Sequence, residues 1–345
     1  MGVKQSIVSI FISHYGCGHA CIFCNQRKIT GVVEIPKANA LKVEIDQQLE
    51  TIKSDIIEIA FFGGSFTGIP VKQQIEYLEI ARDYKVRGKC HRIRLSTRPD
   101  YISPEIVERL MQYQVDLVEL GCQSFSNAVL AASKRGHDKN AIYTAIDILK
   151  RYDIDFGIQL MAGLPGDTKT IFMRSVEAAI GLKPHTVRLY PALVIKDTEM
   201  EALYLNGLYQ PINLETAIDW CASALRKFRR QGINVIRIGL QNTDLIELGA
   251  DVVAGPFHPA FGALVYSKIF RDAIVKVLTE SSNLIVWVHP SQMSYVNGQG
   301  KCNLPFYRDV FNTYKIQILQ DKNIPKDHLK IDTGCEIRWT YVMDE

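Results

Sequence analysis

The chain has 345 residues, of which 47% are hydrophobic and 22% are charged. This composition is typical of a globular protein with a sizeable core, and the length suits one large domain, alone or with a small one. The formal net charge of +3 is too small to indicate nucleic-acid binding by itself, and no apolar run of about 18 residues predicts a membrane span. The N-terminal segment lacks the features of a secretory signal, so we expect a cytoplasmic, reducing location.

Short β-rich apolar runs alternate with segments of helical spacing along the first part of the chain. The runs cover residues 6–14, 56–64, 92–99, 117–124, 155–165 and 186–194. Strands that alternate with helices favour βα units and a parallel sheet, and six such units form most of a TIM-type barrel. We therefore predict an α/β fold, a partial TIM-type (β/α)6 barrel whose chemistry lies at the carboxyl ends of its strands.

The pattern changes after residue ~200. Residues 213–231 predict an amphipathic helix, 234–241 a strand, 251–262 a loop and 263–280 a helix. From residue 283 the order strand, helix, Asn-Gly-Gln-Gly turn, helix, strand predicts a small α/β (KH-like) unit. The predicted domains are a core barrel over 1–240, a linking loop and helix over 241–282, and the C-terminal unit over 283–345.

Three of the eight cysteines lie within eight residues as Cys-x3-Cys-x2-Cys: Cys17, Cys21 and Cys24. Such clustering indicates metal binding rather than a disulfide framework. Three thiolates in one loop suit three irons of a [4Fe–4S] cubane and leave the fourth iron open. The alternative is a structural zinc site that uses the three cysteines with His14 or His19, but zinc sites usually pair two short clusters and no second one appears.

A glycine-rich loop, Gly63-Gly64-Ser65, follows the second predicted strand. Glycines let a backbone approach a ligand closely and expose its N–H and C=O groups. The loop lies about 40 residues after the cysteines, at the end of a strand, which is where the barrel prediction places the chemistry.

With these two elements the chain resembles the radical S-adenosylmethionine (SAM) superfamily. Five further stretches, at 63–70, 96–102, 120–137, 161–168 and 189–209, resemble the radical SAM core of the Elongator catalytic subunit and its bacterial and archaeal relatives, over roughly residues 6–240. The chain less closely resembles oxygen-independent coproporphyrinogen oxidases. It departs from the Elongator subunit in a shorter spacing between the first two cysteines, and we expect no acetyltransferase domain.

The resemblance implies a [4Fe–4S] cluster and SAM as cofactors. It places Gly63, Gly64 and Ser65 at the methionyl amine of SAM, although Ser65 stands where the family has Glu. Arg98 is implied at the SAM carboxylate, Gln123 at the ribose, and Phe23 and Gly163 near the adenine. Each has a structural alternative: an ion pair for Arg98, a backbone hydrogen bond for Gln123, a core aromatic for Phe23 and a turn for Gly163. The sequence identifies no catalytic residue.

The resemblance also suggests RNA, tRNA first, as a partner, and an electron donor of the flavodoxin or ferredoxin type; we expect no membrane partner. Basic runs at 82–98 and 226–237 offer phosphate contacts, or solvated helix faces. We therefore expect an enzyme that cleaves SAM to a 5′-deoxyadenosyl radical and modifies an RNA base. The alternatives are a small-molecule or tetrapyrrole substrate, or a non-catalytic, metal-bearing RNA-binding protein.

Overall fold

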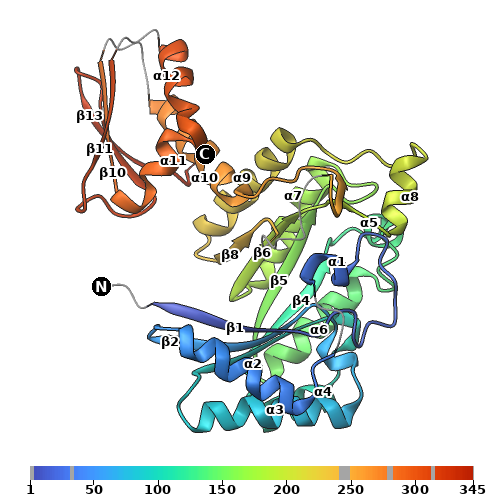
Figure 1. The fold of residues 1–345 in the computed structure, drawn as a ribbon. Coiled ribbons are helices and arrows are strands. Elements are labelled where there is room, and N and C mark those ends of the chain that lie inside the picture. The colour runs from blue at the N-terminus through green and yellow to red at the C-terminus, as the bar shows by residue number, and fades with distance from the viewer. Residues whose placement is uncertain (1–3, 32–34, 241–248, 278–282, 312–314, 345) are drawn as a thin grey trace. The chain divides into compact units, whose positions relative to one another are not determined.

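A computed structural model describes residues 4–31, 35–240, 249–277, 283–311 and 315–344. The chain divides into two compact units (Figure 1). Unit 1 comprises residues 1–212 and 240–257, and unit 2 comprises residues 213–239 and 258–345. None of the helices in these described ranges has the length and apolar character needed to cross a membrane.

The larger sheet has the strand order β1-β2-β3-β4-β5-β6-β8. Its strands are β1 Gln5–Phe11, β2 Ile56–Phe62, β3 Arg92–Thr97, β4 Leu117–Gln123, β5 Asp155–Ala162, β6 Thr186–Pro191 and β8 Asn234–Ile238. Neighbours from β1 to β6 pair in parallel, as expected for strands joined by crossover helices. This arrangement confirms the predicted partial TIM-type α/β barrel with an additional C-terminal unit.

Several of the helices of unit 1 begin where short polar side chains cap them. They are α1 Gln26–Thr30, α2 Ala38–Thr51, α3 Val71–Val86, α4 Pro104–Gln112, α5 Asn127–Ala132, α6 Lys139–Arg151, α7 Lys169–Leu182 and α8 Glu199–Leu205. Ser103, Asp138 and Thr168 each accept a backbone N–H from the first turn of the helix that follows, which satisfies a donor that the helix leaves open. Helix α3 packs on the strands: the ring of Phe61 in β2 stacks on that of Tyr77 in α3, with ring centroids 6.0 Å apart.

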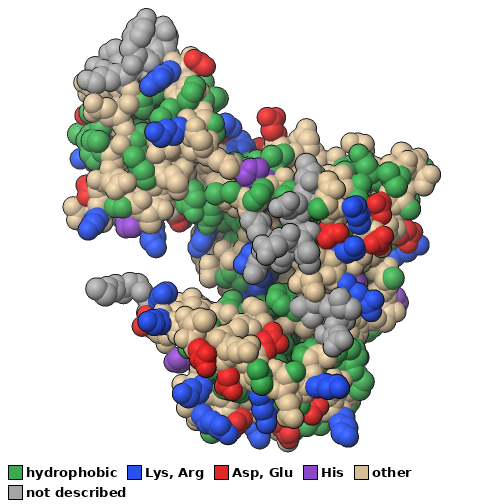
Figure 2. Space-filling model, in the orientation of Figure 1, with side chains coloured by type: hydrophobic (Ala, Val, Ile, Leu, Met, Phe, Trp, Pro, Cys, Tyr) green, Lys and Arg blue, Asp and Glu red, His purple; other side chains and the backbone are tan. Residues whose placement is uncertain are grey.

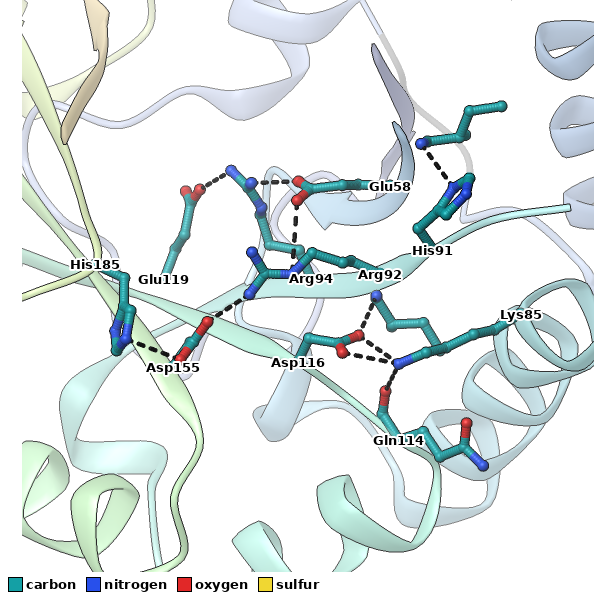
Figure 3. A network of polar contacts seen from close by, with 12 residues as sticks. Glu58, Lys85, His91, Arg92, Arg94, Gln114, Asp116, Glu119, Asp155 and His185 are labelled. Carbon is teal, nitrogen blue, oxygen red and sulfur yellow. Dashed lines mark hydrogen bonds and ion pairs between the residues drawn. The ribbon is translucent and has the colours of Figure 1, made fainter. Parts of the chain in front are cut away.

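A buried charged network lies on the strands (Figure 3). Arg94 of β3 binds Glu58 of β2 on one side and, at 2.8 Å, Glu119 of β4 on the other. Glu119 also accepts hydrogen bonds from Arg188 of β6 and Gln159 of β5, both at 3.0 Å. Glu58 and Glu119 are 1% exposed, and buried carboxylates are stable only with such partners. The network therefore ties together the strands from β2 to β6.

Unit 2 holds a four-stranded sheet in the order β11-β10-β12-β13, together with helices (Figure 1). Its elements are α9 Leu214–Arg230, β8, α10 Phe261–Val277, β10 Asn283–Val288, α11 Met293–Asn297, α12 Asn303–Phe311, β11 Lys315–Gln320, β12 His328–Asp332 and β13 Ile337–Tyr341. The predicted strand–helix–turn–helix–strand order is present from β10 to β11. The antiparallel strands β12 and β13 were not expected.

Two details differ from the predicted loop at 251–262. Val252–Ala254 forms the short strand β9, which pairs antiparallel with β7, Val194–Ile195. The helix expected from residue 263 begins earlier, at Phe261. The first difference arises because the two valines of β9 meet a partner strand nearly sixty residues away, a contact that local sequence does not encode.

Candidate metal centre

The cysteine loop follows β1 and ends at α1. His14 adopts a left-handed backbone conformation, with φ of 56°, and its N–H bonds the Gly63 carbonyl at 3.0 Å. The Nε2 atom of the same ring accepts the backbone N–H of Gln26 at 2.7 Å. His14 therefore fixes both ends of the loop, and its Nε2 atom is already engaged by a backbone N–H. Burial lowers the pKa of its ring, which keeps the imidazole neutral as the accepting role requires.

Each of the three cysteine sulfurs in this loop meets at least one polar side chain at hydrogen-bond distance. Cys17 Sγ lies 3.3 Å from the Ser65 hydroxyl, Cys21 Sγ accepts from Arg135 Nη1 at 3.0 Å, and Cys24 Sγ accepts from Gln26 Nε2 at 3.5 Å. Hydrogen bonds to cysteine sulfur are a principal means by which proteins orient and tune metal–thiolate groups. The three partners come from three different segments of the chain, so the fold builds this shell of donors around the loop.

The three cysteine sulfurs are soft ligands of the kind that bind iron in iron–sulfur clusters. Burial, and next the nearby Cys21 sulfur, raises the pKa of the Cys24 thiol to about 12, so a metal must displace its proton to bind. Within the described ranges no three or more His, Cys, Asp and Glu side chains gather as ligands of a single metal ion. A cubane differs from such a site because each cysteine binds a different iron.

The glycine loop crosses the cysteine loop with backbone against backbone. Ser65 N donates to the Tyr15 carbonyl at 2.9 Å. A Cβ atom on Gly64 would lie 2.4 Å from the Tyr15 oxygen and 2.5 Å from the Ile12 oxygen. Gly64 is therefore required by the close approach of the two loops. Ser65, 1% exposed, turns its hydroxyl toward Cys17.

The loop after α5 contains a site residue that the sequence did not single out. Arg135 is 6% exposed, and besides Cys21 it binds the Gly121 carbonyl through Nη2. It lies 114 positions from Cys21 along the chain. The only signal in the sequence is that Arg135 lies within the stretch 120–137, which resembles the Elongator core. Nothing in the linear pattern indicates that this arginine reaches the cysteines.

Arg98 and Gln123, the polar candidates for SAM contacts, lie beside Arg135. Arg98 is bound by the Asp100 carboxylate through Nε and Nη2, and it donates to the Arg135 carbonyl. Its Nη1 lies 3.9 Å from Cys21 Sγ. Gln123 has φ of 66°, and its buried Oε1 has no hydrogen-bond partner within the described part of the chain.

The position of Gly121 shows how close Gln123 lies to the cysteines. A Cβ on Gly121 would lie 3.2 Å from the Gln123 amide nitrogen and 3.4 Å from Arg135 Nη2. The Gln123 amide and the Arg135 guanidinium therefore both lie beside Gly121, and Arg135 in turn reaches Cys21. A buried acceptor without a partner is uncommon, and one in a strained backbone conformation favours a ligand contact.

Phe23 and Gly163 lie around an apolar cluster beside the cysteines. Phe23 packs with Leu164, Tyr209 and other buried side chains, and Cys21 and Cys24 lie against the same cluster. Gly163, with φ of 84°, accepts the Tyr209 hydroxyl at 2.6 Å through its carbonyl. The predicted adenine-side residues are thus gathered on one side of the cysteine loop.

The two basic runs offered as phosphate contacts are largely paired within the fold. In the first run the partners are Tyr113 for Arg82, Asp116 for Lys85, Asp83 for Arg87, Asp155 for Arg92 and the two glutamates for Arg94. In the second, Arg226 is 9% exposed and binds Asp272 at 3.2 Å. On the face drawn in Figure 2, Lys and Arg side chains are interspersed with Asp and Glu. Much of the first run, and Arg226 of the second, is therefore engaged within the fold.

Comparison with known families gives two matches. A family model described as the radical SAM superfamily matches residues 11–179, and one described as the radical SAM C-terminal domain matches residues 184–271. The two models together span most of unit 1 and the beginning of unit 2.

The curated proteins and solved structures that are similar to the chain include three from Methanocaldococcus species. It is 25% identical over 256 residues to the tRNA uridine(34) acetyltransferase of Methanocaldococcus infernus, a match that covers 62% of this chain and 48% of that protein. It is 29% identical over 224 residues to an uncharacterised protein of Methanocaldococcus jannaschii, covering 61% and 68% respectively. The structure of archaeal M. infernus Elp3 with an N-terminal deletion superposes with a TM-score of 0.64 at 22% identity, covering 79% of this chain and 64% of that one. The chain spans about half the length of the acetyltransferase.

Proposed function

The chain belongs to the radical SAM superfamily, and from this premise we propose that it holds a [4Fe–4S] cluster on Cys17, Cys21 and Cys24 and cleaves SAM. The observation that carries the proposal is the cysteine loop, in which each sulfur meets its own hydrogen-bonding side chain. When bound, the cluster and SAM supply one-electron chemistry, the reductive cleavage of SAM to methionine and a 5′-deoxyadenosyl radical. The protein's part is to bind and orient the cluster and SAM and to shield them from competing reactions.

The residues around the loop suggest how SAM is held. We assign Gln123 to the ribose hydroxyls, because its unpartnered Oε1 accepts a donor such as a hydroxyl. Arg98 keeps only Nη1 for a ligand carboxylate, since Asp100 occupies two of its other donors. Gly63 and Gly64 present backbone groups toward the methionyl amine, and Ser65 supports Cys17 instead of replacing the family's glutamate.

The apolar cluster around Phe23 and Leu164 forms the proposed adenine side of the site. Its side chains exclude water from one flank of the cysteine loop. A dry flank favours a planar aromatic ligand and protects a reactive radical from side reactions with solvent. Gly163 contributes a backbone carbonyl that Tyr209 already fixes in place.

We propose an RNA base, in tRNA first, as the substrate. The support is the similarity to the M. infernus tRNA uridine(34) acetyltransferase, which is 25% identical to this chain over 256 residues. The acetyl-transfer half of that activity is not part of the proposal, because the match covers 48% of that protein. An electron donor of the flavodoxin or ferredoxin type completes the proposed reaction.

The cofactor proposal is tested by anaerobic reconstitution. We expect about four iron and four sulfide per chain, and formation of 5′-deoxyadenosine from SAM with dithionite as the reductant. Cys17→Ala, Cys21→Ala and Cys24→Ala should each abolish both. Cys90→Ala is the matched control, since this buried cysteine lies against Ala81 and away from the loop. Stoichiometric zinc without 5′-deoxyadenosine would overturn the proposal.

A further inference from the structure

We propose that Arg135 is a positioning residue that holds Cys21 and raises the reduction potential of the cluster. The inference rests on the proposed function, since it concerns the proposed cluster. The observation behind it is the positive charge of the buried Arg135 side chain. Arg135 is 6% exposed, and among the described residues no carboxylate pairs with it.

A buried guanidinium needs a compensating negative charge. The other buried arginines near the strands have carboxylate partners: Arg94 has two glutamates and Arg98 has Asp100. Arg135 instead directs Nη1 to Cys21 Sγ at 3.0 Å and Nη2 to a backbone carbonyl. Because an unpaired buried charge is costly, the arrangement points to a Cys21 thiolate, carried by a cluster, as the counter-charge.

The loop that carries Arg135 is held firmly against the cysteine loop. Arg135 N donates to the Leu130 carbonyl at 3.0 Å, and the Ser133 carbonyl accepts the N–H of Ile22 at 3.3 Å. Gly136, with φ of 77°, fits against the His19 ring, where a Cβ would lie 2.6 Å from the ring atoms. The contact between Arg135 and Cys21 is therefore built into two packed loops.

One donor of Arg135 remains unused. Its Nε atom is buried and has no hydrogen-bond partner in the described ranges. A buried donor without a partner indicates a group that the bound state supplies. An inorganic sulfide of the cluster and the SAM carboxylate are both anionic acceptors suited to it.

The charge of Arg135 should shift the reduction potential of the cluster upward. Reduction adds one negative charge to the cluster, and a fixed cation that donates to a ligand sulfur stabilises the reduced form more than the oxidised form. Arg135 should therefore make the cluster easier to reduce. The test separates charge from geometry with Arg135→Gln, which removes the charge, and Arg135→Lys, which keeps the charge but loses the fork of two donors.

The measurement is a redox titration of the reconstituted protein followed by electron paramagnetic resonance, with iron content and SAM affinity measured alongside. For Arg135→Gln we expect the ratio of reduced to oxidised cluster at a fixed potential to fall about tenfold, equivalent to about 59 mV for one electron. Arg135→Lys should fall between this variant and the wild type. Lys134→Gln is the matched control: it removes the neighbouring positive charge, which is exposed and paired with Glu199, and should leave the potential unchanged.

An unchanged potential in both Arg135 variants, at full iron content, would overturn the inference. If Arg135→Gln loses its cluster, the intermediate potential expected for Arg135→Lys decides: a lowered potential would support the inference, and a wild-type potential would overturn it. A wild-type protein that assembles no cluster would overturn the proposed function instead. The two failures are therefore distinguishable in one series of samples.

Discussion

At the scale of single residues, the cysteines illustrate what a sequence can and cannot reveal. Their short spacing is a local pattern, so the candidate ligands could be predicted from it directly. Two of their hydrogen-bond partners could not, because Ser65 and Arg135 lie 48 and 114 positions from the sulfurs they meet. The same limit applies to Arg98, whose Asp100 partner is adjacent but whose contact with the Arg135 carbonyl depends on folding.

Asp167 gives a prediction about pH. Its carboxylate accepts the N–H groups of Gly163 at 3.1 Å and Thr168 at 2.9 Å, yet burial outweighs both bonds and raises its pKa to about 6. The folded protein therefore binds this proton more tightly than the unfolded chain. The stability that protonation contributes is full below about pH 4 and is lost as the pH rises through about 6.

Asp167→Asn should remove this dependence, because the amide carries no charge to bury. Between pH 5 and pH 7.5, the free energy of unfolding of the wild type should fall by on the order of 1–2 kcal/mol more than that of the variant. Denaturant titration at the two pH values measures the difference. Asp153→Asn, at an exposed position, is the control, and equal slopes for wild type and Asp167→Asn would contradict the prediction.

At the scale of elements, strands β1 to β6 of the barrel could be predicted from the sequence, whereas several of the other strands were not. The runs behind β1 to β6 are rich in β-branched residues and end in Gly, Pro or polar residues, which are local signals. Strand β13 was not predicted although its sequence, Ile-Arg-Trp-Thr-Tyr over 337–341, alternates apolar and polar residues. In the structure Ile337, Arg338 and Trp339 are all exposed, so the alternation does not correspond to a buried face. The strands β7 and β9 are too short to be recognised without their pairing partner.

The crossing of the two loops gives a prediction about Gly64. Gly64→Ala places a methyl group against two backbone oxygens, which cannot move aside as a flexible side chain can. We expect the reconstituted variant to retain less than half of the wild-type iron, because the cysteine loop must shift. Iron analysis together with circular dichroism separates this local effect from unfolding.

Gly181→Ala in α7 is the matched control for that substitution. No heavy atom lies within 4 Å of its added Cβ, and alanine is the better helix former. It should keep full iron content and gain up to about 1 kcal/mol in stability. A wild-type iron content in the Gly64→Ala protein would contradict the prediction, because it would show that the two loops can move apart without loss of iron.

At the scale of the whole molecule, substrate recognition is the least predictable property. The basic runs looked like phosphate contacts in the sequence, but a linear pattern does not show where the acidic partners lie. Asp155, for example, is 63 positions from Arg92, which it binds. The division into two units matters too: unit 2 includes α9 and α10, so removing residues 283–345 would expose apolar side chains of α10 such as Phe270 and Ile274.

The intact protein is therefore the right material for testing RNA. If tRNA is the substrate, its affinity should fall more than tenfold between about 50 and 200 mM salt, since each neutralised phosphate releases a counterion. Filter binding or fluorescence anisotropy with tRNA and with heparin measures both affinity and preference. Equal affinity for the two polymers at physiological salt would remove RNA from the proposed function and leave the SAM chemistry untouched.

The uneven exposure of the three loop cysteines has a consequence for handling in air. Cys17 is exposed, whereas Cys21 and Cys24 are half-buried and lie against the apolar cluster around Phe23. Oxygen and alkylating reagents attack accessible thiolates first. Damage to the loop should therefore begin at Cys17, so that a protein exposed briefly to air keeps two intact ligands and can be repaired by adding iron, sulfide and a reducing thiol.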